Sequence, residues 1–159
     1  KDPNPYANYG SAMKSNKNWP MAVEWQGANS KAIQEATSCK ALKAIASDRA
    51  KMDALLAKVK EAYRTSPLDS TQIAAITQFV MCKKNPDAPK MRSRWVAAIL
   101  QAAKNAPDAY RKLFFFDQLR WCGRKGDIKA IKNIAKASGD KAVQDFAEMV
   151  AKELNQAFE

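Results

Sequence analysis

The fold is decided by residues 107–156, which read PDAYRKLFFFDQLRWCGRKGDIKAIKNIAKASGDKAVQDFAEMVAKELNQ. Apolar side chains recur in this stretch with the spacing of amphipathic helices. Gly123 and Gly139 follow two of the periodic segments as helix-ending residues, whereas Asp127 and Asp140 precede the next segments as N-caps. The stretch therefore predicts three helices joined by short turns, the first of them opened by Pro107.

The same signals continue toward the N-terminus and predict four more helices after one short helical turn. The expected starts are Trp19-Pro20 for the short turn, then Ser30, Ser47, the capping box Asp69-x-x-Gln72, and the turn bracketed by Pro86 and Pro89. The chain has only five glycines and no stretch that alternates as a strand does. Short links between these helices predict an all-α fold with antiparallel neighbours.

A cysteine recurs along the chain at a nearly constant interval. Cys39, Cys82 and Cys122 are 43 and then 40 positions apart. An interval of this length is typical of stacked helical hairpins, because one hairpin cannot bury its own apolar face. We expect the thiols to pack as small apolar groups, and a Cys39–Cys82 disulfide is the alternative.

The C-terminal stretch also carries an ordered set of short motifs. These are Cys122-Gly123, Gly126-Asp127, Ala130-Ile131, and then Asp140, Val143, Gln144 and Ala147. The set resembles the HEAT-like and armadillo-like helical repeat family, with Gln144 in place of the usual arginine of an inter-repeat hydrogen-bond ladder. The resemblance implies a right-handed α-solenoid-like stack of about three antiparallel hairpins plus a final capping helix. Residues 18–159 would form this single domain, with residues 1–17 as an extended arm.

Composition excludes several classes of reaction. The chain has no histidine, so it has no Ser-His or Cys-His nucleophile, no imidazole acid or base, and no histidine metal ligand. The three cysteines lack the close spacing of zinc sites, and no glycine-rich phosphate loop is present. We therefore expect no enzymatic activity, no metal and no cofactor.

The positive charge is concentrated in one part of the chain. Of a formal net charge of +11, residues 83–136 contribute +10, with 14 Lys and Arg against four Asp and Glu. Stacked helices would gather such residues on one surface that attracts polyanions, although an ordinary solvated surface is the alternative. The candidate partner-binding residues are Arg92, Arg94, Arg111, Lys112, Arg120, Trp121, Arg124, Lys125, Lys129 and Lys132.

Aromatic and acidic residues within the basic stretch bear on the kind of partner. Trp95 lies on an apolar stripe and is expected in the core, whereas Trp121 is less tied to one and could stack on a nucleobase. We expect Phe114–Phe116 to be packed, because an inner helix has neighbours on both sides. Asp117 is expected to have a raised pKa through burial and to form a structural ion pair. Its expected partners are Arg120, Arg124 and Lys112.

These patterns favour a non-enzymatic interaction module that binds a macromolecular acidic partner, a protein in the first instance, through a basic surface on the fourth to sixth predicted helices. Nucleic acid is the alternative partner, with a DNA base-processing enzyme as its remote extension, because HEAT-like DNA alkylpurine glycosylases place an acidic residue beside tryptophans in a basic concavity. This chain carries no motif that matches theirs residue by residue.

No segment has the roughly 18 apolar residues of a membrane span. The polar start at Lys1 favours an exported protein over a cytoplasmic one, and an uncovered repeat edge would favour self-association.

Overall fold

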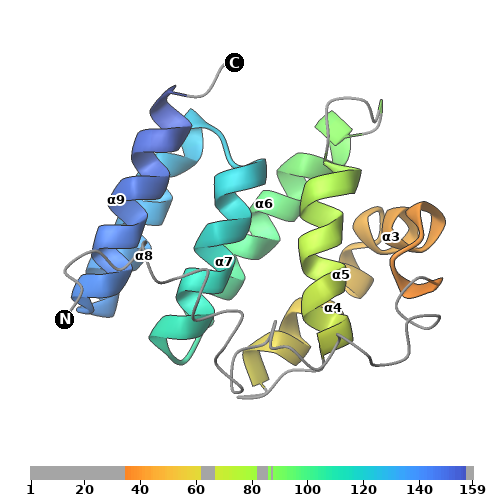
Figure 1. Cartoon of the computed structure of the whole chain (residues 1–159), viewed down its shortest axis with the longest axis horizontal. Coiled ribbons are helices and arrows are strands. Elements are labelled where there is room, and N and C mark those ends of the chain that lie inside the picture. Colours follow the sequence, from red (N-terminus) through yellow and green to blue (C-terminus); the bar gives the residue numbers. More distant parts are fainter. Residues whose placement is uncertain (1–34, 62–66, 82–85, 87, 157–159) are drawn as a thin grey trace.

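The computed structural model describes residues 35–61, 67–81, 86 and 88–156. Within these ranges the regular structure is helical and no strand occurs, so the predicted all-α class is confirmed (Figure 1). The predicted arm at 1–17, the predicted helical turn at 19–26 and Cys82 lie outside the described residues.

The described residues form α-helices joined by short links, with one π-helical and one 3₁₀ segment among them. In chain order these are α3 (Cys39–Ala46), α4 (Arg49–Glu61), α5 (Pro67–Ala75), the π-helical η2 (Ile76–Val80), α6 (Ala88–Asn105), α7 (Ala109–Cys122), the 3₁₀ turn η3 (Lys125–Asp127), α8 (Ile128–Ser138) and α9 (Lys141–Gln156).

Side-chain caps begin α3, α7 and α9, and the sequence predicts the cap of α9. The Asp140 carboxylate accepts the Val143 N–H at 3.1 Å and begins α9, which confirms that cap. Asp108 accepts the Arg111 N–H at 2.9 Å, so α7 begins just after Pro107. Gly139 ends α8 with φ at 65°, a left-handed conformation that favours glycine.

The prediction of one continuous helix from Ser30 is wrong within the described residues. The chain turns at Thr37 and Ser38, and α3 begins only at Cys39. The Ser38 hydroxyl accepts the Ala41 N–H at 3.3 Å, so this residue caps a new helix. A local side-chain hydrogen bond thus competes with helix continuation, as serine commonly does.

The predicted capping box at Asp69 and Gln72 is also wrong, because α5 begins two residues earlier at Pro67. Proline suits the first turn of a helix, where its missing N–H has no partner to lose. The Gln72 amide instead donates to the Ala36 carbonyl at 3.0 Å. This bond ties α5 to the turn that precedes α3.

Consecutive helices pack against one another, and so do alternate ones. In Figure 1, α8 and α9 lie at one end and α3 at the other, with α4 to α7 between them. Helix α6 packs against α7, and α8 packs against α9. In addition α4 contacts α6, α6 contacts α8, η2 contacts α7, and α7 contacts α9.

Helix α7 is the centre of the core. Phe114, Phe115 and Phe116 each have 0% exposure, which confirms the predicted packing of this run. Successive residues of a helix point about 100° apart, so three buried neighbours in sequence require cover over a wide arc. That cover comes from α6, α9 and η2.

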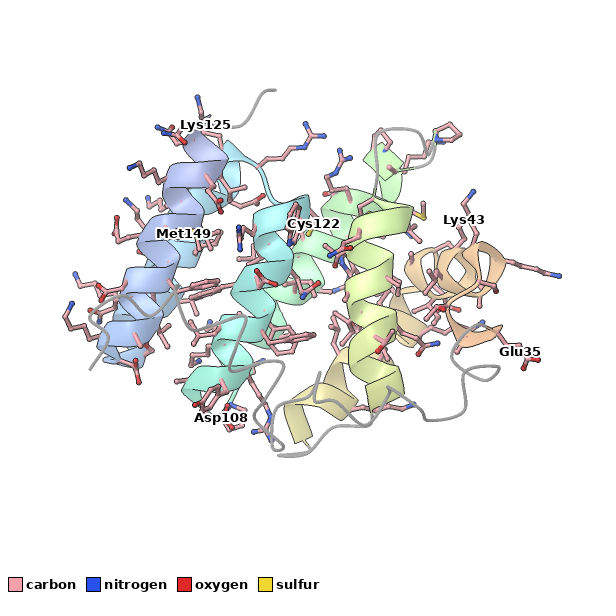
Figure 2. All side chains as sticks on the ribbon, viewed as in Figure 1. Glu35, Lys43, Asp108, Cys122, Lys125 and Met149 are labelled. Atoms are coloured by element: carbon pink, nitrogen blue, oxygen red, sulfur yellow. The ribbon has the colours of Figure 1, made fainter. Side chains whose placement is uncertain are left out.

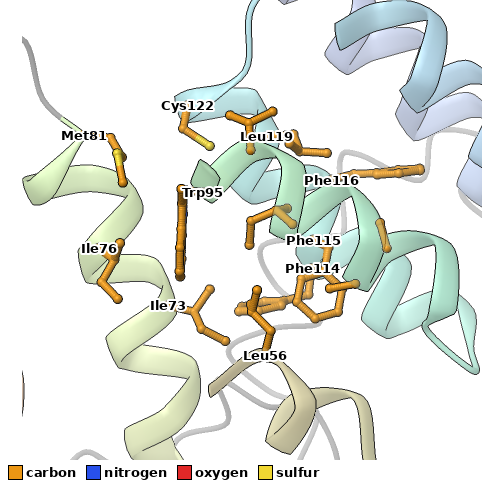
Figure 3. Packing of buried hydrophobic residues seen from close by; sticks show 14 of the residues in the cluster. Leu56, Ile73, Ile76, Met81, Trp95, Phe114, Phe115, Phe116, Leu119 and Cys122 are labelled. Carbon is orange, nitrogen blue, oxygen red and sulfur yellow. The ribbon is translucent and has the colours of Figure 1, made fainter. Parts of the chain in front are cut away.

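The predicted burial of Trp95 is confirmed, and its polar edge has a partner. The ring faces Ile73 and Ile76 of the neighbouring α5–η2 segment (Figure 3). Its indole N–H donates to the Thr77 hydroxyl at 3.0 Å, and that hydroxyl donates to the Ile73 carbonyl at 3.0 Å. A buried N–H without an acceptor is costly, so this relay fixes α6 on η2.

The cysteines do not occupy equivalent places. Cys122 is buried at the end of α7, as predicted, but Cys39 is an exposed free thiol at the start of α3. The expectation that Cys39 packs in the core is therefore wrong, and the recurrence does not mark equivalent positions at Cys39 and Cys122.

Among the described helices, none combines the length and apolar character needed to cross a membrane.

The Trp95–Thr77 relay gives a stability prediction. Thr77→Val replaces the hydroxyl with a methyl group of similar size and leaves the indole N–H without its acceptor. We expect the free energy of unfolding, measured by urea denaturation, to fall by about 1–3 kcal/mol. Thr77→Ser keeps the hydroxyl and is the matched control. Equal losses in the two variants would show that the methyl packing, and not the hydrogen bond, matters here.

Candidate basic surface

Arg111 does not belong to a partner-binding surface. Its side chain is only 5% exposed and forms an ion pair with Asp108, the residue that caps α7. A buried charge is tolerated when it is paired, and this pair supports the start of the helix. The prediction that Arg111 contacts a partner is therefore wrong, because periodicity did not reveal its burial.

Lys112 has a structural role as well. Its ammonium group donates to the carbonyls of Ala103 and Lys104, at 2.9 and 3.2 Å. These carbonyls belong to the last turn of α6, where a helix leaves its acceptors unpaired and favours a cation. Partial burial lowers the pKa of Lys112, and the Asp108 charge opposes that shift. The side chain joins the end of α6 to the start of α7.

Arg120 is held between two carboxylates. Its guanidinium lies 2.7 Å from Glu153 of α9 and 3.3 Å from Asp117 of its own helix. The predicted ion pair of Asp117 with Arg120 is thus confirmed. Burial raises the pKa of the Asp117 carboxyl, and the Arg120 charge only partly opposes this shift. The cluster joins α7 to α9, so the charge of Arg120 is largely compensated.

Two further predicted residues lie apart from these. Lys132 of α8 pairs with Glu148 of α9 at 3.7 Å, with both side chains well exposed. Exposed pairs of this kind contribute little to stability. Arg94 is exposed on the side of α6 that faces α3, away from α7 and α8.

The remaining predicted residues gather at one edge of the molecule, which we call the basic edge. It consists of Arg92, Trp121, Arg124, Lys125 and Lys129. Figure 1 shows that the start of α6, the end of α7 and the start of α8 lie along this edge. Lys125 points outward there (Figure 2). Arg124, Lys125 and Lys129 are exposed. Trp121 is 60% exposed, which settles the question that its sequence position left open.

A pocket within the basic edge brings Arg92 and Arg124 together. It lies between the first half of α6 and the turn that precedes α8, and Asp127 also contributes to its wall. Burial lowers the pKa of Arg92, and the nearby positive charge of Arg124 lowers it further. The Arg92 guanidinium also donates to the Met81 carbonyl at 3.0 Å. Two like charges are therefore held close, and an anion would relieve their repulsion.

The turn after α7 positions Arg124. The Gly123 N–H donates to the Leu119 carbonyl at 2.7 Å and closes α7, as predicted for this glycine. The Asp127 carboxylate accepts the Arg124 N–H at 2.8 Å. Asp127 therefore fixes the 3₁₀ turn η3, and its carboxylate makes no capping bond to α8, contrary to the predicted cap.

Cys122 cannot act as a nucleophile in this setting. Its thiol is buried and lies 3.3 Å from the Gln118 carbonyl. Burial raises its pKa to about 12, and the Asp127 charge adds to the shift. The thiolate is the reactive form of cysteine, so this thiol stays protonated and inert at neutral pH.

A second pocket is lined by three cations that the sequence did not indicate, Lys40 and Lys43 of α3 and Lys90 of α6. The predicted Arg94 of α6 lines the same pocket. Lys40 and Lys43 fall outside the basic stretch at residues 83–136, so a charge count along the chain could not reveal them. Their grouping with α6 is produced by tertiary packing.

The end of α7 gives a second stability prediction. A Cβ atom on Gly123 would lie 2.5 Å from the Leu119 carbonyl oxygen and 3.2 Å from Leu154. Moving the backbone to relieve this clash costs energy, so Gly123→Ala should lower the free energy of unfolding by about 1–3 kcal/mol. A Cβ atom on Gly126 would meet nothing within 4 Å, and Gly126→Ala is the control. A loss as large in the control would contradict the steric explanation.

Asp117 gives a pH prediction. Its raised folded-state pKa means that the folded protein holds this proton more tightly than the unfolded chain does. Ionisation of Asp117 therefore lowers the free energy of unfolding as the pH rises above the ordinary value of 3.8. Asp117→Asn lacks this titration, so its stability relative to the wild type should increase as the pH rises through that window. Urea denaturation across a pH series tests this, and a relative stability that stays constant or decreases would contradict it.

Comparison with known proteins gives no family assignment. The chain matches no family model, no curated protein and no solved structure. The resemblance to HEAT-like repeats thus stays a prediction from short motifs. A proposal for the function must therefore come from the chemistry of the described residues.

Proposed function

We propose that this chain is a non-enzymatic helical-repeat module that binds an acidic protein through the basic edge. The observation that carries this proposal is the closeness of Arg92 and Arg124 across one pocket. Like charges held together repel each other, and an anionic ligand between them would relieve that repulsion. Lys125 and Lys129 extend the positive surface beyond the pocket.

The separation of structural cations from edge cations supports the proposal. Arg111, Lys112 and Arg120 are held by carboxylates or helix-end carbonyls of the same chain. Arg124 and Lys129 are exposed, and neither side chain has a carboxylate of the described residues within salt-bridge distance. A surface of purely solvated lysine and arginine would not explain why Arg92 and Arg124 converge.

The repeat architecture is part of the same proposal. Contacts between alternate helices, α4 with α6, α6 with α8, and α7 with α9, are what stacked hairpins produce. The hairpins would be α4–α5, α6–α7 and α8–α9, stacked in the right-handed sense of HEAT-like solenoids. In this arrangement α9 belongs to the third hairpin, and the edge formed by helix ends and links is available to a partner.

The chemistry of the described residues is consistent with a binding role. The chain has no histidine, and the Cys122 thiol is buried with its pKa raised to about 12. The Asp117 carboxyl, which would be the acidic group of a base-processing enzyme, is engaged by Arg120 at 3.3 Å. We assign Asp117 a structural role.

Nucleic acid is the second candidate partner, favoured by Trp121. Its ring is 60% exposed, and the Arg120 guanidinium lies 5.5 Å from the ring centroid. An exposed aromatic ring in a basic surface provides a stacking platform for an unpaired base. An acidic protein has no need of this ring, so the two candidates differ in what Trp121 contributes.

One binding experiment tests both candidates. Fluorescently labelled poly-L-glutamate and single-stranded DNA are titrated with the full chain at low and moderate salt. We expect binding at low salt, and Arg124→Ala/Lys125→Ala/Lys129→Ala should weaken it about tenfold or more. For single-stranded DNA the salt slope should also decrease by about two, since three cationic contacts are lost. Trp121→Ala should weaken DNA binding alone.

The matched control removes three charges elsewhere. Lys51→Ala/Lys104→Ala/Lys136→Ala changes exposed lysines outside the basic edge and lowers the net charge equally. Equal weakening in both triple variants would mean that only the net charge matters, and the basic edge would not be a site. If the wild type binds neither polymer at low salt, the proposed function is wrong.

A further inference from the structure

A second positively charged pocket lies between α3 and α6, on a different side of α6 from the basic edge. Its wall is formed by Lys40, Lys43, Ala44, Ser47, Lys90, Met91 and Arg94. Figure 2 places Lys43 at the end of the molecule opposite Lys125. The pocket therefore needs an explanation separate from the basic edge.

Four cations meet in this pocket and no carboxylate lines it. Lys40, Lys43, Lys90 and Arg94 supply four positive charges, and the remaining wall residues are neutral. Within the part of the chain that the structure describes, none of the four cations forms an ion pair. Met91, which is buried, is an apolar member of the pocket wall.

Helix geometry brings the four cations together in two pairs. Lys90 and Arg94 are four residues apart on α6, and Lys40 and Lys43 are three apart on α3, so each pair shares one helix face. Like charges at these spacings destabilise a helix. The fold places the pair of α3 and the pair of α6 on the wall of the same pocket.

The helix dipoles do not compensate for two of these charges. Lys40 lies in the first turn of α3 and Lys90 in the first turn of α6, where the positive end of the dipole disfavours a cation. Lys43 lies in the last turn of α3, which favours a cation. Folding alone therefore does not explain why Lys40 and Lys90 occupy the first turns of these helices, whereas a bound anion would explain their positions.

We propose that the α3–α6 pocket binds a compact anion that carries two or more phosphate groups. Three ammonium groups and a guanidinium around one depression suit several closely spaced negative charges. The Ser47 hydroxyl adds a neutral hydrogen-bonding group at the wall. A long polyanion would call for cations spread along a surface, whereas these four line a single depression.

This proposal is independent of the proposed function. Arg92 is two residues from both Lys90 and Arg94, so it points to the opposite side of α6, into the pocket of the basic edge. Charge removal in one pocket leaves the cations of the other in place. Loss of binding can therefore be assigned to one site.

Inorganic triphosphate is the probe, titrated into the full chain by isothermal calorimetry at low salt. We expect saturable binding and a rise in melting temperature, with weaker binding of orthophosphate. Lys40→Gln/Lys90→Gln should weaken triphosphate binding about tenfold or more. The same variant, without ligand, should melt no lower than the wild type, because both substitutions remove repulsion at helix starts.

The controls decide between this pocket and a general charge effect. Lys51→Gln/Lys136→Gln lowers the net charge equally at exposed lysines outside the pocket, and it should keep the affinity for triphosphate. Arg124→Ala/Lys125→Ala/Lys129→Ala should keep it as well. The proposal is overturned if the wild type does not bind triphosphate, or if either control weakens binding as much as the pocket variant does. Equal affinity for orthophosphate would overturn the requirement for two or more phosphate groups.

Discussion

Helix α7 carries apolar side chains around most of its circumference, and the rest of the structure follows from the need to cover it. Phe114, Phe115 and Phe116 span about 200° of helix surface and are fully buried. A single partner helix covers one stripe, so α7 is stable only when α6, α9 and η2 enclose it. Only a narrow strip of the α7 surface stays exposed, and Tyr110 and Trp121 are the large apolar side chains on it. Enclosure of one helix by three segments places α8 and α9 on one side of it and the α3–α5 region on the other.

This enclosure decides which cations are available to a ligand. A charged side chain on an enclosed helix must find a partner within the fold, since an uncompensated buried charge is very costly. Arg111 accordingly pairs with Asp108, and Arg120 pairs with Asp117 and Glu153. Positive charge outside α7 has no such constraint. The cations of the two proposed sites accordingly lie on α3, on the first half of α6 and around the start of α8.

The sequence predicted the helical class, several helix ends and the buried aromatic residues, whereas it missed some local caps and the cations whose roles depend on tertiary contacts. The ends of α8 and α9 at Gly139 and Asp140 follow from hydrogen bonds within about four residues, so they can be read directly. The break at Ser38 depends on a local hydrogen bond to Ala41, but the apolar periodicity of the segment did not reveal it. The π-helical segment lies where η2 meets α6, at the Trp95–Thr77 hydrogen bond. The count of charges along the sequence placed Arg111 among the candidate partner-binding residues, because such a count cannot show that a side chain is buried. It omitted Lys40, because that residue joins the basic residues of α6 only after folding.

The first turns of α6 explain why one basic stretch gives two pockets. Lys90, Arg92 and Arg94 alternate in sequence, and a helix turns residues two apart to nearly opposite sides. Lys90 and Arg94 therefore face α3, whereas Arg92 faces the turn that carries Arg124. Both pockets lie near the positive end of the α6 dipole, where cations are least stable and anions most stable. The features that favour anion binding here thus also destabilise the free protein. Such a conflict between stability and local charge is expected of a binding surface rather than of a scaffold.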